Sequence, residues 1–192
     1  MSQSIEIISD TLLSDNWGKL HKIEYKHTLP NGNSYTGIRE AYNRGNGAVI
    51  LLYNIAKGTV ILTSQLRIPT YVNGNKTGMM IEACAGMLDE NDPEECIRRE
   101  TQEETGYTLT DVKKVMEVYM SPGGVTEILY FFTAAYDDAM KTGDGGGLEK
   151  EHENIEVLEM PFSEAFNMIY NGEIKDAKTI MLLQHVRLQG IL

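Results

Sequence analysis

Three glutamates lie close together in one short stretch of this 192-residue chain: Glu100, Glu103 and Glu104. If the stretch is helical, their spacing of three and four residues puts all three on one face. Like charges at this spacing repel one another, and the C-terminal half of a helix is the unfavourable end for anions. A bound cation would cancel the repulsion, and clustered carboxylates are ligands that Mg²⁺ and Mn²⁺ prefer. The pattern therefore favours a divalent metal site, with a solvated acidic face as the alternative.

The sequence around these glutamates has clear signals for both ends of a helix. Asp92 is a typical N-cap, Pro93 suits the first helical position, and Glu95 would complete a capping box. Gly106 is a typical residue just past a helix C-terminus. We therefore expect one helix over residues 92–106, with the glutamates in its second half.

The stretch from Gly86 to Tyr107 resembles the Nudix box, the signature motif of the Nudix hydrolase superfamily. The motif is long and its spacing is fixed, so a chance match is improbable. The loop after Gly86 is one residue short, which puts Asn91 or Asp92 where the first glutamate of the motif is expected, and Thr101 replaces an aliphatic residue. The positions that match are Gly86, Arg99, Glu100, Glu103, Glu104, Gly106 and Tyr107.

This resemblance implies a fold of the α/β class, the Nudix α/β/α sandwich with a mixed sheet. It also implies hydrolysis of a nucleoside diphosphate linked to another group. The implied cofactor is Mg²⁺, with Mn²⁺ as the alternative, and the implied ligands are Glu100, Glu104 and the backbone carbonyl of Ala85. Glu103 would be a further ligand or would be held by Arg99, which lies four residues before it and is spaced to pair with it.

The resemblance implies one more carboxylate, on the loop before the strand that starts at Ile155. It would act as a general base or metal ligand brought in by loop closure. Alignment from Ile155 selects Glu153, whereas alignment from Gly147 selects Glu151. The loop is two residues longer than the family pattern, so we prefer Glu153 and keep Glu151 as the second candidate.

A further signal narrows the subfamily. Pro122 lies sixteen residues after Gly106, as it does in the Nudix clade that acts on ADP-ribose and nucleotide sugars. A closer resemblance, over nearly the whole chain, is to the bacterial GDP-mannose pyrophosphatases. It implies cleavage of GDP-mannose to GMP and mannose 1-phosphate by a homodimer whose N-terminal strands enter the partner's site. The segments that carry it are Leu13–Trp17, Arg44–Ala48, Ser121–Glu127, Gly145–Gly147 and Ile155–Glu159.

The same resemblance implies a set of substrate contacts. Trp17 would stack on the base, and Glu127 would point at the substrate or its attacking water. Arg39 would contact a phosphate or the base, and Arg67 the phosphates, since arginine suits phosphate well. Lys178 would contact the sugar or phosphate end. The full set is Trp17, Ile38, Arg39, Glu40, Arg67, Ala85, Gly86, Met87, Glu104, Glu127, Glu151 and Lys178.

Other functions remain open at this point. ADP-ribose or another nucleoside diphosphate sugar would use the same metal site and differ only in base and sugar contacts. A non-catalytic nucleotide-sugar sensor would normally lack the helix carboxylates, and all three are present. A triphosphatase of damaged nucleotides is disfavoured by Pro122 and by the long N-terminal hairpin.

Composition limits the partners and the compartment. The formal net charge is −11, which argues against nucleic acid or an anionic membrane as the main partner. No apolar run approaches the ~20 residues of a membrane span, and no secretory signal opens the chain. Cys84 and Cys96 are too few for a disulfide framework, so buried thiols and a cytoplasmic location are expected.

We expect N-terminal strands used in dimerisation over residues 1–44 and a Nudix hydrolase domain over 45–192, with its Nudix box at 86–107. A hairpin should turn at Pro30–Asn33, and Gly143–Gly147 should be a flexible surface loop. Ser163 should cap its helix, and Ile68–Thr77 should be a loop. The expected strands are 20–29, 34–43, 48–53, 59–66, 79–85, 112–120, 128–136 and 155–160; besides 92–106, the expected helices are 163–170 and 176–188.

Overall fold

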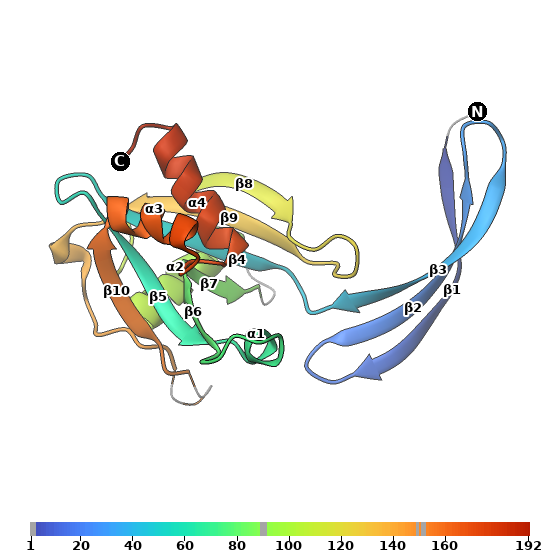
Figure 1. Ribbon diagram of the computed structural model, residues 1–192, viewed down its shortest axis with the longest axis horizontal. Helices are drawn as coiled ribbons and strands as arrows, with labels where there is room; N and C mark the ends of the chain where they lie inside the picture. The colour runs from blue at the N-terminus through green and yellow to red at the C-terminus, as the bar shows by residue number, and fades with distance from the viewer. Residues whose placement is uncertain (1–2, 89–91, 149, 151–152) are drawn as a thin grey trace. The chain divides into compact units, whose positions relative to one another are not determined.

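The computed structural model describes residues 3–88, 92–148, 150 and 153–192. The chain divides into two compact units (Figure 1). The first comprises residues 1–46 and 118–129, and the second comprises residues 47–117 and 130–192.

The first unit contains an antiparallel sheet in the order β1-β2-β3: β1 (Ser4–Asp15), β2 (Lys19–Thr28) and β3 (Ser34–Asn43). The β2–β3 hairpin confirms the prediction from the Pro30–Asn33 turn. Gly32 has a φ of 85° and donates its N–H to the carbonyl of Leu29 at 2.9 Å. Strand β1 was not predicted. Its register on β2 shifts twice, between Ile7 and Ser9 and between Leu12 and Ser14, and these irregularities interrupt the alternation that marks a strand in sequence.

The second sheet is built around a fully buried strand. Strand β4 is an unbroken apolar run apart from its ends, and all eight of its residues are buried, as expected for a strand covered on both faces. The order is β10-β5-β4-β9-β8, with β6 paired to β5 and β7 paired to β4. The strands are β4 (Gly47–Asn54), β5 (Thr59–Leu66), β6 (Met79–Glu82), β7 (Cys84–Met87), β8 (Lys113–Tyr119), β9 (Ile128–Ala135) and β10 (Glu156–Pro161).

Helices cover this sheet. Figure 1 shows α3 (Phe162–Asn171) and α4 (Ala177–Leu188) in front of it and α2 (Pro93–Thr105) behind it. Helix α2 contacts β7 and β4, and α4 also contacts β4. The α/β class with a mixed sheet between helices, predicted from the Nudix resemblance, is confirmed. Within the described residues, no helix is both long and apolar enough to span a membrane.

The apolar core fixes α2 against the sheet. Ile97 of α2 and Ile50 and Leu52 of β4 belong to one buried cluster. Cys84 belongs to the same cluster, Cys96 is also buried, and the two thiols form no disulfide, as predicted. Since α2 carries the glutamates of the motif, this core sets where their carboxylates lie.

Three local predictions were wrong. Ser163 does not cap α3, because the helix already begins at Phe162 with Pro161 as its N-cap residue. The segment predicted as a loop starts with a short helix, α1 (Ile68–Val72). The expected strand 79–85 is two strands, β6 and β7, because Ala83 leaves β5 and the chain continues along β4.

Candidate active site

Helix α2 begins and ends where the sequence predicts. The Asp92 carboxylate accepts a hydrogen bond from the N–H of Glu94 at 2.8 Å. Gly106 takes the left-handed conformation, with φ of 78°, and its N–H bonds the carbonyl of Gln102 at 3.0 Å. Asp92, one of the two residues in place of the motif's first glutamate, is thus an N-cap, and Asn91 lies outside the described residues.

The inward face of α2 carries polar groups that all find partners. Thr101 is fully buried at the position where the motif has an aliphatic residue. Its hydroxyl donates to the carbonyl of Ile97 at 2.6 Å, which removes the cost of burying it. Glu104 is 3% exposed and accepts from the backbone N–H of Ala85, on β7, at 3.3 Å. Glu104 therefore meets the strand whose carbonyl was predicted as a metal ligand.

The carboxylate of Glu104 lies in a poor environment for an isolated anion. Burial raises its pKa to about 7, against hydrogen bonds from Cys84 and Ala85 that favour the anion. The nearby carboxylates of Glu100 and Glu153 raise it further. A buried carboxylate surrounded by others of the same charge is a group that a cation would stabilise.

Glu100 lies against the same strand. A Cβ atom built on Gly86 would overlap Cγ and Cδ of Glu100, so the side chain occupies the space that a residue other than glycine would fill. Burial raises the pKa of Glu100 despite its ion pair with Arg99 at 3.0 Å, and Glu103 and Glu153 add to the rise. Arg99 thus forms an ion pair with its neighbour Glu100, a contact that the spacing in the sequence did not predict.

The glycine-rich segment from Gly143 to Gly147 packs on the C-terminal end of α2. The N–H groups of Gly146 and Gly147 donate to the carbonyls of Glu104 and Glu103 at 2.8 and 3.1 Å. These bonds satisfy carbonyls that a helix end leaves unpaired. The segment has no helix or strand, as predicted for a loop, and these hydrogen bonds hold it against α2. Gly145 is required because its φ is +73° and a Cβ would approach the carbonyl oxygen of Glu104 at 2.6 Å.

This segment also positions Glu153. The side chain of Glu153 accepts from the N–H of Leu148 at 2.9 Å. Its charge influences both Glu100 and Glu104, so the structure brings these three carboxylates into one electrostatic cluster. Glu151, the second candidate from the sequence, lies outside the described residues.

A separate acidic residue, Glu127, lies in the first unit. It is 6% exposed and forms an ion pair with Arg44 at 2.5 Å. The Arg44 guanidinium also lies 5.7 Å from the ring centroid of Trp17, the residue predicted to stack on a base. Trp17 itself is 67% exposed. Arg44 was not among the predicted site residues, and the signal for it was its place directly after a predicted strand.

The loop that leads to Glu127 is held by strand β3. Tyr42 donates its N–H to Gly124 at 2.8 Å and accepts from the N–H of Thr126 at 3.0 Å. Ile38, Arg39 and Glu40 lie on the same strand and are all exposed. Arg39 Nη1 donates to the carbonyl of its neighbour Ile38 at 2.8 Å.

Two predicted cationic contacts, Arg67 and Lys178, meet on one acidic residue of the second unit. Glu82 accepts from Arg67 Nε at 2.6 Å and from Lys178 Nζ at 3.3 Å. Glu82 was not predicted, although an acid in the apolar run from Met79 to Ala85 was a visible signal. Ala85, Gly86 and Met87 follow on β7, where Met87 is 36% exposed.

The chemical type of the available ligand atoms, all of them oxygens, suits a hard divalent cation. Carboxylate oxygens of Glu100, Glu104 and Glu153 and the carbonyl of Ala85 are the oxygen ligands that Mg²⁺ takes. Among the residues that the structure describes, no three Asp, Glu, His or Cys side chains already converge as a metal site. Burial is the main cause of the raised pKa values of Glu100 and Glu104, and neighbouring carboxylates add to it, so a bound cation would stabilise both anions and the residues fit such an ion.

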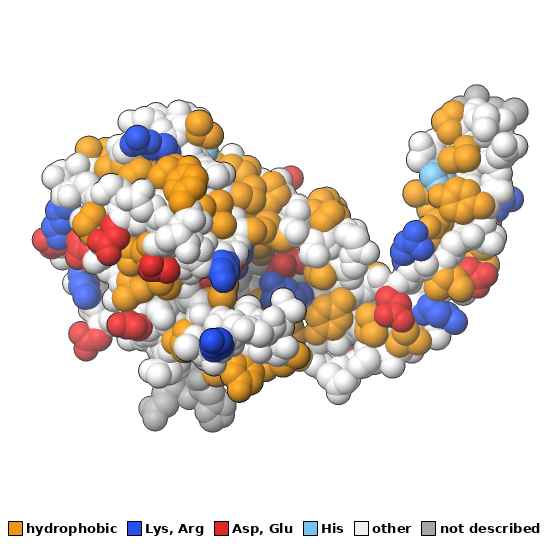
Figure 2. All heavy atoms as spheres, in the orientation of Figure 1, with side chains coloured by type: hydrophobic (Ala, Val, Ile, Leu, Met, Phe, Trp, Pro, Cys, Tyr) orange, Lys and Arg blue, Asp and Glu red, His pale blue; other side chains and the backbone are white. Residues whose placement is uncertain are grey.

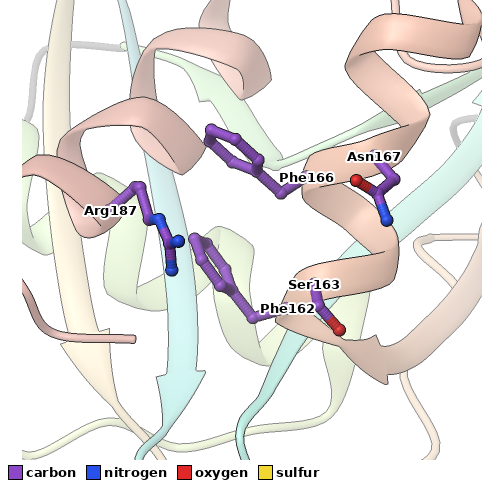
Figure 3. Close-up of a pocket in the computed structure, with 5 residues that line it drawn as sticks. All are labelled: Phe162, Ser163, Phe166, Asn167 and Arg187. Atoms are coloured by element: carbon purple, nitrogen blue, oxygen red, sulfur yellow. The ribbon is translucent and has the colours of Figure 1, made fainter.

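Figure 3 shows a cavity of about 130 Å³ at α3 and α4, lined by Phe162, Ser163, Phe166, Asn167 and Arg187. None of the predicted site residues lines it. The Arg187 guanidinium lies 5.9 Å from the ring centroid of Phe166. The cavity is smaller than the roughly 300–1,000 Å³ of typical ligand pockets, so it is too small for a nucleotide sugar.

Comparison with known families decides the superfamily. The family described as NUDIX domain matches residues 43–183, which is most of the chain. The chain belongs to the Nudix family. It is therefore a Nudix hydrolase, a class of enzymes that generally use divalent metal ions. The family described as GDP-mannose pyrophosphatase NudK N-terminal domain matches residues 4–42.

Curated relatives match over the whole chain. A GDP-mannose pyrophosphatase from Pectobacterium atrosepticum is 59% identical over 190 residues, which cover 99% of this chain and 97% of that protein. One from Yersinia enterocolitica is 57% identical over 192 residues, 100% of both chains. One from Cronobacter sakazakii is 53% identical, again over 100% of both. These identities support nucleotide-sugar pyrophosphatase activity in this Nudix hydrolase.

Proposed function

We propose that this Nudix hydrolase cleaves the pyrophosphate bond of GDP-mannose to give GMP and mannose 1-phosphate, with Mg²⁺ as its cofactor. The observation that carries the proposal is the partly buried cluster of Glu100, Glu104 and Glu153 beside β7. Support for the substrate comes from the full-length relatives named GDP-mannose pyrophosphatase. The oxygen donors of the cluster favour Mg²⁺, with Mn²⁺ as the alternative.

In this proposal, Glu100, Glu104, Glu153 and the Ala85 carbonyl hold the metal. When bound, Mg²⁺ ions neutralise the pyrophosphate and lower the pKa of a bound water. Arg99, which pairs with Glu100 at 3.0 Å, keeps that carboxylate in place. Glu103 lies on the same helix and supplies further negative charge beside Glu100. Glu127 faces the substrate or the attacking water.

The remaining residues bind the substrate. Arg67 contacts the phosphates and Lys178 the sugar or phosphate end, for which their joint ion pair with Glu82 is support. Gly86 and Met87 follow Ala85 on β7, next to the carboxylates. Trp17 stacks on the base, and its 67% exposure leaves the ring open to do so. Glu151 remains the second candidate for the loop carboxylate.

We also propose that the active form is a homodimer in which Ile38, Arg39 and Glu40 of one chain reach the other chain's site. The support is the apolar surface of the N-terminal sheet (Figure 2). Side chains that would normally be buried are 48–65% exposed there, and a second copy covering them would gain their burial. They are Ile5, Ile7, Ile8, Leu12, Leu13, Tyr35 and Ile38. The N-terminal strands, residues 1–44 in our division, would then be the dimerisation element of the Nudix domain, 45–192.

Two other functions remain as outcomes of the test. ADP-ribose hydrolysis would use the same carboxylates with different base and sugar contacts. A non-catalytic nucleotide-sugar sensor would bind without turnover, and the carboxylate cluster argues against it.

The test is product analysis by chromatography of GDP-mannose incubated with the purified protein and Mg²⁺. Equal amounts of GMP and mannose 1-phosphate are expected, and EDTA should abolish both. Glu100→Gln should remove turnover without loss of folding, because it relieves repulsion in the cluster. Glu95→Gln is the matched control, since Glu95 is exposed in the first turn of the same helix. Binding of GDP-mannose without products would overturn the proposal in favour of a sensor.

A further inference from the structure

A buried carboxylate holds two cationic side chains that come from different parts of the chain. Glu82 ends β6, and its side chain is only 5% exposed. One of its oxygens accepts from Arg67 Nε at 2.6 Å, and the other accepts from Lys178 Nζ at 3.3 Å. Arg67 follows β5, whereas Lys178 lies in the first turn of α4. Glu82 therefore fixes the relative position of two groups that are 111 residues apart in sequence.

A second carboxylate, that of Asp176, also holds Lys178. Asp176, the N-cap of α4, accepts from Lys178 Nζ at 2.6 Å. The same Asp176 accepts from the Thr179 hydroxyl at 2.7 Å, and that hydroxyl accepts from the N–H of Ala83 at 2.7 Å. Ala83 directly follows Glu82. The start of α4 is thus joined to the strand segment that continues into Ala85 and Gly86.

The two carboxylates Glu82 and Asp176 balance the charges of Arg67 and Lys178, and what remains for a further anion is the hydrogen-bond donors of Arg67. Arg67 uses Nε for Glu82, so its two Nη nitrogens can donate to a ligand at the same time. Arg67 is 37% exposed, whereas Glu82 is nearly sealed, so the accessible end of the pair is the cation. A flexible arginine loses rotamer entropy on binding a phosphate, and holding it beforehand reduces that cost.

We propose that Glu82 is a positioning residue for substrate binding: it holds Arg67 and Lys178 as one preformed receptor for the phosphate groups of the nucleotide sugar. This inference rests on the proposed function, because it takes the nucleotide sugar as the ligand. Glu82 itself touches no substrate and acts through the two cations. Its replacement should therefore weaken binding while leaving the carboxylates on α2 unaffected.

The test is the dissociation constant of GDP-mannose, measured by calorimetry in EDTA so that no turnover occurs. Glu82→Gln keeps the size of the side chain but removes the charge, and we expect about tenfold weaker binding. In a background of Arg67→Ala with Lys178→Ala, Glu82→Gln should change the dissociation constant less than twofold. This loss of effect is the result that a merely structural role would not produce.

Glu159→Gln is the matched control, because Glu159 also accepts from a lysine, Lys57. Its cation is a different one, because Lys57 precedes β5 and Arg67 follows it. Glu159 lies on β10 opposite Ile61 of β5, whereas Glu82 lies on β6 opposite Thr63, and the ion pair of Glu159 is with Lys57, whereas those of Arg67 and Lys178 are with Glu82. We expect the Glu159→Gln variant to bind GDP-mannose as tightly as the unchanged protein does. Glu82→Asp keeps the charge and should restore part of the affinity, and it replaces Glu82→Gln if that variant does not fold.

Two results would overturn the inference. One is a Glu82 variant that unfolds at lower temperature but binds GDP-mannose within twofold of the unchanged protein. The other is an equal loss of affinity in both backgrounds. Turnover with Mg²⁺ is measured separately. Binding of GDP-mannose without hydrolysis would refute the proposed function, and the effect of the Glu82 variants on that binding would still test the role of Glu82. A protein that neither binds nor cleaves GDP-mannose would refute both.

Discussion

Gly86 and Glu100 are in direct contact, and the glycine exists there because the glutamate needs the space. A Cβ atom on residue 86 would overlap the Cγ and Cδ atoms of Glu100. The two residues belong to different elements, β7 and α2, which pack together in the core. The glycine that opens the Nudix motif therefore sets the position of a carboxylate fourteen residues later.

Gly86→Ala should lower kcat by about a hundredfold, since a displacement on the order of 1 Å at a reacting group costs that much. The Glu100 side chain must move, whereas the buried core can stay in place. Initial rates with GDP-mannose and thermal unfolding would measure the two effects. Gly143→Ala is the matched control, because a Cβ there makes only an ordinary contact at 3.9 Å. Normal activity in Gly86→Ala would show that the position of Glu100 is not critical.

Glu153→Gln should lower kcat more than Glu151→Gln does. Glu153 is the loop carboxylate whose charge reaches both Glu100 and Glu104. Removal of one ligand or base group should cost about 10²-fold or more. Steady-state kinetics at saturating Mg²⁺ would compare the variants. A larger loss in Glu151→Gln would transfer the role to Glu151.

The ion pair between Lys57 and Glu159 on the surface should make the stability of the fold depend on pH. Burial opposes ionisation of Glu159, but hydrogen bonds from Lys57 and Tyr136 outweigh it and hold the pKa of Glu159 below its usual value. Such a group stabilises the fold above its unfolded pKa, and the contribution is lost as pH falls through the lowered folded pKa. The pKa of Lys57 is raised, chiefly by Asp138 and Glu159, so its contribution is lost only as pH rises above 10.5.

Glu159→Gln should therefore lower the urea midpoint of unfolding at pH 7 and change it much less at pH 3. Urea titrations of both proteins at the two pH values provide the measurement. An equal destabilisation at both pH values would mean that Glu159 acts through packing and not through its charge.

Shared sites in a dimer predict complementation between inactive chains. Arg39→Ala removes a contact that would be made to the partner's substrate, and Glu100→Gln removes a metal ligand of the chain's own site. A mixed dimer retains one site with both groups intact, so we expect about half of the activity of the unchanged dimer in purified heterodimers. Activity no higher than that of the two parent variants would place Arg39 and Glu100 in the same chain's site.

The sequence predicts most of the fold because the decisive signals are local. Asp92 and Gly106 mark the ends of α2 by the chemistry of helix caps, and both act as predicted. Strand β1 escaped prediction because its bulges interrupt the alternation of apolar residues. The Ser163 cap was wrong because the N-cap is Pro161, two residues earlier, and Phe162 is already helical.

The site was less predictable where its contacts are long-range. The matched motif located Glu100, Glu103 and Glu104, but no spacing rule showed that Arg99 pairs with Glu100. Arg44 and Glu82 gain meaning only through partners far along the chain, at Glu127 and Lys178. The ordered glycine segment likewise depends on carbonyls at the end of α2, which its own composition does not indicate.

The most direct test of the account is the ratio of kcat/KM for GDP-mannose to kcat/KM for ADP-ribose, measured with Mg²⁺ on one protein preparation. Both substrates need the carboxylate cluster, so the ratio reports only the base and sugar contacts. The proposed function predicts a ratio of at least tenfold in favour of GDP-mannose. A preference for ADP-ribose would contradict it, retaining the metal chemistry and removing the assigned substrate.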